Sequence, residues 1–389
     1  MSVKLKKIIL SFVAVTMALS MMACGNKGGS SADAAGNAST TAAKSGKLQV
    51  VTTIFPEYDW VRQVLGENPA GVEMTLLLDS GADLHSYQPT AEDIARISSC
   101  DMFIYVGGES DKWVDDALKE ATNKNMIVLN LLDILGDSAR EEEVVEGMQA
   151  DEHDHDHEDA DHDDADHDHE DADHDDADHA DGDHEEADHA DADHDDADHD
   201  EDGHHHDERE LEYDEHVWLS LKNTKLFAGV IAGKLAELDA ANADAYKKNA
   251  EAYTASLEEL DQQYTTLFAN AKEKTLLFGD RFPFRYMIED YGLSYYAAFI
   301  GCSAETEASF ETITFLAGKV DELGLKNIFV LEGGNQKIAD TVKNSTKSKD
   351  QEIVALNSMQ SITKKDIEDG VTYLGLMKSN YEVLSKALQ

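Results

Sequence analysis

The chain has 389 residues and a formal net charge of −49. So negative a chain repels phosphate, which excludes nucleic acid as a partner. Much of the charge is local, because residues 151–208 contain 32 Asp and Glu without any Lys or Arg, which leaves −17 for the rest.

Residues 1–23 have the pattern of a secretory lipoprotein signal. Three lysines precede an apolar stretch that is short for a membrane span and ends in small residues before Cys24. A cysteine at this point resembles a lipoprotein signal box, so we expect Cys24 to be acylated. An ordinary cleaved signal with a chance cysteine is the alternative. Residues 24–47, rich in Gly, Ser and Ala, predict a flexible tether that holds an extracytoplasmic domain at the membrane.

Apolar strand-like runs alternate with helical stretches in the first half of the chain, which predicts a parallel sheet flanked by helices. These runs are residues 48–53, 72–78, 102–106 and 126–129. His85 follows the second run, ahead of an expected helix N-cap at Thr90. A residue after the carboxyl end of a strand occupies the usual ligand position of an open α/β sheet. His85 is therefore a candidate ligand, although a single histidine is more often a packed or surface residue.

Residues 141–209 are predicted to form a disordered His/Asp-rich loop, because like charges crowd one another and apolar anchors are missing. Histidine recurs there every five residues from His169 to His199, a spacing that gathers the rings on one face of neither a helix nor a strand. We expect a weak, multivalent collector of divalent metal, with a solvated acidic spacer as the alternative. The auxiliary ligands would be His153, His155, His157, His162, His167, His169, His174, His179, His184, His189, His194, His199, His204, His205 and His206.

The remaining histidine, His216, lies in an Asp-Glu-His-aromatic cluster just after this loop, which is unusual for a plain core histidine. Residues 242–269 keep helical periodicity without a break, and a last helix is expected from about Lys364. Cys100 and Cys302 lie far apart in apolar surroundings, so we expect buried free thiols. Strand-like runs of the second half are residues 275–279, 294–300, 326–330 and 353–355.

Three long segments in a consistent order resemble the metal-binding lipoproteins of zinc and manganese ABC uptake systems. They are VVTTIFPEYDWVRQVLGE, LLLDSGADLHSYQPTAEDIARI and EHVWLS. The resemblance covers residues 48–389 except about 141–209. It implies an α/β fold of two lobes, each a mainly parallel sheet flanked by helices, joined by one long rigid helix. The metal-binding N-terminal lobe would be 48–240, the connecting helix 241–270 and the C-terminal lobe 271–389.

The resemblance also implies the metal ligands, with His85 and His216 as the first two. The third family position falls on Arg281, whose guanidinium has no lone pair for a metal. The fourth falls on Asn357, whose amide oxygen is a poorer ligand than a carboxylate.

Three alternatives follow from these departures. Asp280 takes over the third position, with Arg281 paired to a carboxylate such as Glu305 or Glu307; or the site uses the two histidines with water or loop histidines; or metal binding is lost. Asp280 has a competing role as a helix N-cap. Glu332 is a further possible donor.

The predicted function is capture of zinc by His85, His216 and Asp280, and delivery of the ion to an ABC permease and its ATPase by a lipid-anchored monomer. Imidazole donors favour zinc, while manganese stays possible. The alternatives are a manganese-binding homologue, or a surface metal buffer or adhesin-like protein without a transporter. We expect no enzyme, since the sequence has no HExxH helix and no GxSxG nucleophile elbow.

Overall fold

The computed structural model describes residues 47–149, 212–303 and 306–388. Cys24, the predicted tether except its last residue, and the auxiliary histidines therefore lie outside the described residues. Among the described helices, none is both long and apolar enough to cross a bilayer.

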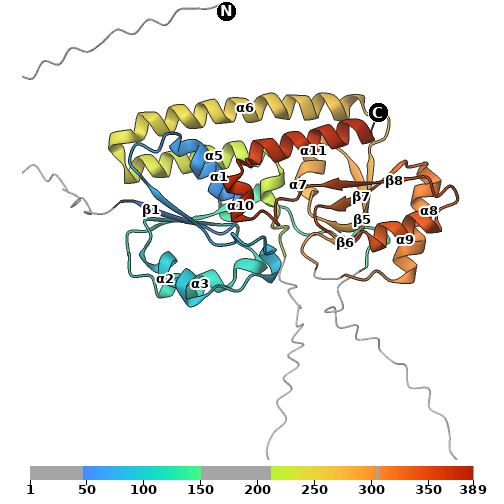
Figure 1. The fold of residues 1–389 in the computed structure, drawn as a ribbon, viewed down its shortest axis with the longest axis horizontal. Helices are drawn as coiled ribbons and strands as arrows, with labels where there is room; N and C mark the ends of the chain where they lie inside the picture. The colour runs from blue at the N-terminus through green and yellow to red at the C-terminus, as the bar shows by residue number, and fades with distance from the viewer. Residues whose placement is uncertain (1–46, 150–211, 304–305, 389) are drawn as a thin grey trace, which may run out of the picture. The chain divides into compact units, whose positions relative to one another are not determined.

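Two four-stranded parallel sheets form the centres of an N-terminal and a C-terminal lobe (Figure 1). Their strand orders are β2-β1-β3-β4 and β6-β5-β7-β8. In each sheet the connections change direction beside the first strand, and the carboxyl ends of the strands there are the usual place for a ligand. The strands are β1 Gln49–Thr52, β2 Glu73–Leu76, β3 Met102–Tyr105, β4 Ile127–Asn130, β5 Thr275–Phe282, β6 Ser294–Ile300, β7 Asn327–Leu331 and β8 Glu352–Leu356.

Helices cover these sheets, and the sequence explains how they begin. Thr90 caps the helix α2 as expected, because its side chain accepts a hydrogen bond from Asp93 N at 3.2 Å and the Asp93 carboxylate accepts one from Thr90 N at 2.9 Å. This capping box fixes the end of the loop that carries His85. The α-helices are α1 Phe55–Leu65, α2 Ala91–Ser99, α3 Trp113–Lys119, α4 Leu131–Leu135, α5 Leu221–Leu238, α6 Ala243–Asn270, α7 Arg285–Tyr291, α8 Phe310–Leu323, α9 Lys337–Ser345, α10 Lys364–Glu368 and α11 Tyr373–Ala387. The short 3₁₀ helices are η1 Leu84–Ser86, η2 Glu109–Asp111, η3 Gly136–Ser138, η4 Val217–Leu219 and η5 Ala240–Asn242.

The helix α6 packs on both lobes (Figure 1). Near its start, the Asn249 side chain donates to Val64 O in the N-terminal lobe at 3.0 Å. Near its end, Tyr264 stacks on Tyr291 of α7 with ring centres 5.5 Å apart. The prediction of two parallel-sheet lobes with one long helix between them is therefore confirmed.

The end of the chain differs from the prediction of one final helix from Lys364. Two helices, α10 and α11, are separated at Gly370, whose φ of 92° is a conformation that favours glycine. The segment around this break bonds to the N-terminal lobe, since Tyr373 N donates to Asp59 Oδ2 at 2.7 Å and Lys364 N to Asp79 O at 2.7 Å. This segment, which was expected in the C-terminal lobe, therefore contacts the N-terminal lobe.

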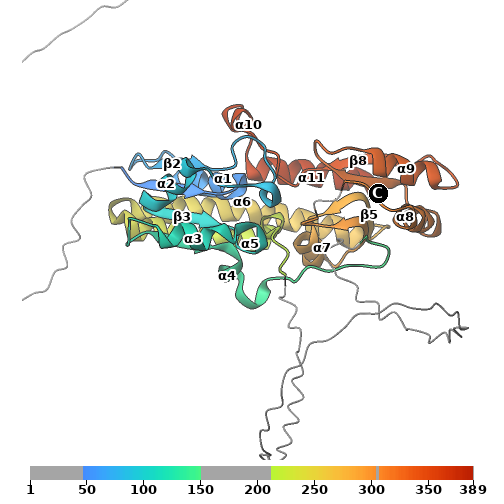
Figure 2. The same cartoon turned by 90° about the horizontal axis from the view of Figure 1, so that it is seen from below.

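Residues 140–149, which we call the strap, run from the N-terminal lobe onto the C-terminal one (Figure 2). Most of these residues were predicted to belong to a disordered loop, but they have defined contacts. Glu141 pairs with Tyr213 in an antiparallel bridge, and Gln149 N donates to Ala298 O of β6 at 3.0 Å. The strap therefore lies beside the segment that leads into His216.

Candidate metal centre

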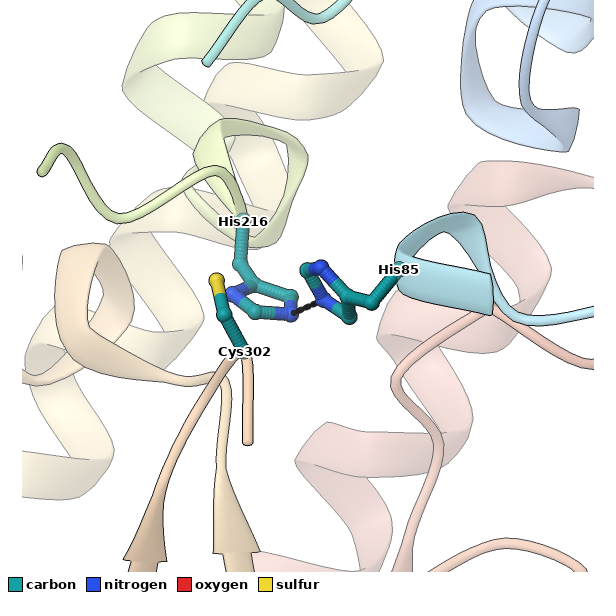
Figure 3. Close-up of side chains that lie close together, drawn as sticks. All are labelled: His85, His216 and Cys302. Carbon is teal, nitrogen blue, oxygen red and sulfur yellow. Dashed lines mark hydrogen bonds between the residues drawn. The ribbon is translucent and has the colours of Figure 1, made fainter. Parts of the chain in front are cut away.

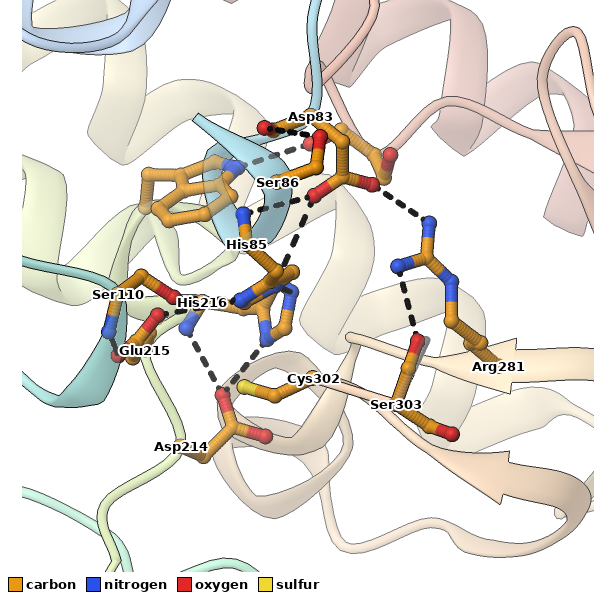
Figure 4. Close-up of polar contacts among 12 residues, drawn as sticks. Asp83, His85, Ser86, Ser110, Asp214, Glu215, His216, Arg281, Cys302 and Ser303 are labelled. Atoms are coloured by element: carbon orange, nitrogen blue, oxygen red, sulfur yellow. Dashed lines mark hydrogen bonds and ion pairs between the residues drawn. The ribbon is translucent and has the colours of Figure 1, made fainter. Parts of the chain in front are cut away.

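His85 is held on the short helix η1 by its neighbours. The Asp83 side chain caps η1 and accepts a hydrogen bond from His85 N at 3.1 Å. The ring Nδ1 lies 2.8 Å from Ser110 Oγ and 3.2 Å from Glu215 Oε2 (Figure 4). Burial would raise the pKa of Glu215, but its hydrogen bond to His85 holds that pKa below the usual range. An ionised Glu215 thus orients the ring, and Nε2 is left for another partner.

His216 is fully buried at the start of η4. Asp214 Oδ1 accepts from His216 N at 2.9 Å and lies 3.1 Å from its ring Nδ1. On another side, a Cβ at Gly301 would lie 2.9 Å from His216 Cε1, so only glycine lets the loop after β6 approach this ring so closely. The ring is consequently fixed by both lobes.

The two rings, both from the N-terminal lobe, face each other with their Nε2 atoms 3.1 Å apart (Figure 3). The carboxylates beside both Nδ1 atoms assign the protons to Nδ1, as in carboxylate–histidine–zinc triads. Both Nε2 atoms then present lone pairs to each other, which repel unless a cation lies between them. Two nitrogens that share one tetrahedral zinc lie about 3.3–3.4 Å apart, given bonds of 2.0–2.1 Å. The pair is therefore spaced to chelate a single ion with little movement.

Gln360, which sequence reasoning missed, brings an oxygen to the same point. When its amide is assigned so that the nitrogen donates to Asp83 Oδ1 at 2.7 Å, the oxygen lies 3.1 Å from His216 Nε2. Asn357, the expected fourth position, instead accepts from Met359 N at 2.9 Å. The oxygen nearest the histidine pair in this loop thus comes three residues later in the chain.

Cys302 is the second residue that the sequence did not indicate as a donor. It is a free thiol, as expected, but only partly buried. One ligand atom from each of His85, His216 and Cys302 lies within 4.8 Å of the other two (Figure 3). Burial raises the pKa of the Cys302 thiol well above its usual range, and the Glu142 carboxylate raises it further, so the thiol keeps its proton when no cation is near.

Arg281, at the third family position, connects the loops that carry the donors (Figure 4). Its Nη2 donates to Asp83 Oδ2 at 2.7 Å, and its Nη1 donates to Ser303 O at 3.2 Å. Burial would raise the pKa of Asp83, but the charge of Arg281 holds that pKa below its usual range. Arg281 therefore ties the residue before η1 to the residue after Cys302, and Asp83 is the carboxylate with which it pairs.

Asp280 lies in β5 and is not part of this group of donors. Its Oδ2 accepts from Leu331 N at 3.0 Å and its Oδ1 from Arg281 N at 2.8 Å. It lines a cavity of about 320 Å³ together with His85 and Arg281. The N-cap of α7 is Phe284, so Asp280 has no capping role there. Its assignment as a ligand stays a prediction.

Glu332, the other possible donor, accepts from Ser358 N at 2.7 Å and from Ser358 Oγ at 3.0 Å. These bonds fix the loop that follows β8. Glu332 thus supports the segment that leads to Gln360.

Acidic side chains surround the histidine pair, which favours a cation there. The strap contributes Glu142, whose Oε1 accepts from Cys302 N at 3.3 Å. Burial, reinforced by the Asp214 carboxylate, raises the pKa of Glu142 to about 7. Burial likewise raises the pKa of Asp111 to about 7, with Glu215 nearby adding to the effect. A divalent cation would relieve this concentration of negative charge.

The sequence matches one known protein family over most of its length. Residues 50–387 match the family described as zinc-uptake complex component A, periplasmic. The zinc-binding protein AdcA of Streptococcus pyogenes (strain MGAS8232) is 28% identical over 345 residues, which are 87% of this chain and 56% of AdcA. This chain therefore spans about half the length of that relative.

A relative of similar length is the high-affinity zinc uptake system protein ZnuA of Bacillus subtilis, 26% identical over 358 residues, 91% of this chain and 93% of that protein. The crystal structure of the Zn(II)-bound ZnuA-like domain of Streptococcus pneumoniae AdcA has the same fold, with a TM-score of 0.59 and 23% identity over 88% of this chain and 99% of that one. Because the family match runs through nearly all of the described residues, the chain belongs to the family of periplasmic A components of zinc-uptake complexes.

Proposed function

We propose that this chain is an extracytoplasmic solute-binding protein that captures one Zn²⁺ ion between His85 and His216 and passes it to an ABC permease with its ATPase. The observation that carries the proposal is the pair of Nε2 atoms, 3.1 Å apart, each on a ring whose Nδ1 is held by a carboxylate. The activity is binding and release without bond chemistry. The zinc-related names of the relatives agree with it.

Zinc is preferred to manganese on the chemistry of the donors. Imidazole nitrogens suit zinc, whereas manganese prefers carboxylate and water oxygens. The oxygen of Gln360 adds a further donor position that is neutral and lacks the charge of a carboxylate. Asp280 is not one of the main ligands in this proposal, because both of its carboxylate oxygens already accept backbone hydrogen bonds.

The His/Asp-rich loop has a separate role in the proposal. Its fifteen histidines would bind divalent ions weakly, because a site that must be ordered on binding loses part of its free energy to that ordering. The loop would raise the local concentration of metal, while the preformed pair selects the ion. Acylation of Cys24 would keep the protein, as a monomer, beside the permease.

Calorimetric titration of the full chain with zinc tests this division. We expect one tight site and several weak ones. The double variant His85→Ala/His216→Ala should lose the tight site and keep the weak ones, whereas deletion of residues 151–208 should do the reverse. His153→Ala/His155→Ala, which also removes two imidazoles, is the matched control and should keep the tight site. Loss of the tight site on deletion of 151–208 would contradict the proposal.

A further inference from the structure

We propose that Cys302 is a metal ligand of this chain, whose thiolate completes the donor set begun by His85 and His216. The inference rests on the proposed function and deepens it, because it states which ions the site prefers. It also explains how a site of this family can work with an arginine at the third ligand position.

The geometry brings the thiol close to the two nitrogens. A sulfur and a nitrogen that share one tetrahedral zinc lie about 3.6 Å apart, given bonds near 2.3 and 2.0–2.1 Å. The three ligand atoms already lie within 4.8 Å of one another, so the thiol needs to approach by about 1.2 Å at most. A rotation of the Cys302 side chain would supply such a movement.

The loop that carries Cys302 is held in place on several sides. Glu142 accepts the Cys302 N–H at 3.3 Å, and Arg281 donates to Ser303 O at 3.2 Å. Gly301 packs against the His216 ring at a distance that admits no Cβ. A donor on a loop fixed in this way loses little ordering entropy when it binds a metal. Arg281 is thus a positioning residue, which holds the loop that carries the thiol.

Cys100 shows what a structural cysteine looks like in the same chain. Its thiol is fully buried, donates to Ile97 O at 3.2 Å and lies 3.3 Å from the sulfur of Met126. These are packing contacts within the N-terminal core. Cys302 instead has two imidazoles near its sulfur and carboxylates around it, which are the surroundings of a metal ligand.

Binding of zinc by the thiol is a balanced exchange. The S–H bond breaks, a sulfur–zinc bond forms, and the proton leaves to solvent. A thiolate contributes the negative charge that a neutral third imidazole would not, and it is a soft donor. The site should therefore favour zinc, and cadmium with it, over manganese more strongly than a site of imidazoles and oxygens.

Titration of the full chain with Co²⁺ tests the inference directly. Cobalt bound by a thiolate shows a sulfur-to-metal charge-transfer band in the near ultraviolet, and the His/Asp-rich loop has no cysteine that could produce it. We expect the band to saturate at one equivalent of cobalt and to disappear when zinc displaces the cobalt. It should be lost in Cys302→Ser and kept in the matched controls Cys24→Ala and Cys100→Ala. The zinc affinity of Cys302→Ser should fall at least about tenfold, the lower end of the loss typical for a mere supporting residue.

The outcomes separate this inference from the proposed function. Stoichiometric cobalt binding that needs His85 and His216 but shows no sulfur band would overturn the role of Cys302 and leave zinc capture intact. Failure of His85→Ala/His216→Ala to weaken binding would overturn both. If Cys302→Ser does not fold, alkylation of the unaltered chain can test the same role. One equivalent of zinc should protect Cys302 from the alkylating reagent, and a lack of protection would overturn its role as a ligand.

Discussion

The two lobes contribute to the metal centre in different ways. The N-terminal lobe supplies two imidazoles, each with a carboxylate at Nδ1, from segments that resemble the family closely. The C-terminal lobe supplies Cys302 and Gln360 from loops, together with Arg281, where the family pattern is lost. The comparison indicates that the N-terminal pair provides most of the affinity and that the C-terminal donors strengthen its preference for zinc.

Removal of an imidazole should have the largest effect. Structural zinc sites bind with about 10–16 kcal/mol, so one of about four donors accounts for roughly 3 kcal/mol, or a hundredfold in affinity. We expect His216→Ala to weaken zinc binding by about this factor, measured by competition with a chelator. His153→Ala should leave the tight site unchanged. An equal loss in both variants would erase the distinction between cleft and loop.

Removal of a supporting carboxylate should cost less. In Asp214→Asn the Nδ1 proton of His216 loses its anionic partner, which typically lowers metal affinity by about 10–100-fold. The exposed Asp116, which pairs with Lys119, provides the control Asp116→Asn. Unchanged affinity in Asp214→Asn would mean that the N-terminal lobe does not act through its carboxylates.

Arg281 tests the C-terminal lobe. Arg281→Met keeps most of the side-chain volume but releases both Asp83 and Ser303 O, so the loops with His85 and Cys302 should become less ordered. We expect a loss of about tenfold in zinc affinity, at the low end of the range for supporting residues. The ratio of zinc to manganese affinity should also fall. Arg96→Met, which removes an exposed arginine that pairs with Glu92 on α2, is the control.

Glu142 links the strap to the C-terminal lobe, and its effect on stability should depend on pH. Its pKa is raised to about 7, so its charged form is disfavoured in the folded metal-free protein. The resulting cost is absent below about pH 4.5 and complete above about pH 7. Glu142→Gln should therefore stabilise the metal-free protein by about 1 kcal/mol at pH 8, after solvent screening, and by nothing near pH 4.5.

Urea unfolding with a chelator present measures this difference at both pH values. Glu141→Gln, at an exposed neighbouring position, should show no such dependence. A gain at pH 4.5 equal to that at pH 8 would exclude the buried charge as its cause.

Much of the fold could be predicted, because hydrophobic periodicity is a local property of the sequence. The long helix was expected at 242–269 and is Ala243–Asn270, and β6 has the bounds expected for it. The end of the chain was predicted wrongly, because the break at Gly370 depends on contacts with Asp59 and Asp79 of the N-terminal lobe. Such contacts leave no periodic signal.

The site residues likewise differ in how far the sequence could predict them. His85 and His216 were selected because each lies within a segment that resembles the family, and the structure brings their Nε2 atoms together. Cys302 and Gln360 were missed, since their approach to the pair depends on how the lobes pack. One signal was present, because Cys302 follows the carboxyl end of β6 much as His85 follows that of β2.

X-ray absorption at the zinc edge, on the chain loaded with one equivalent of zinc, would reveal the neighbours of the bound ion. We predict two imidazole nitrogens at about 2.0–2.1 Å and one sulfur at about 2.3 Å. Deletion of residues 151–208 should leave this spectrum unchanged. A first shell that loses its imidazole signal on this deletion, and keeps it in His85→Ala/His216→Ala, would contradict zinc binding between the lobes.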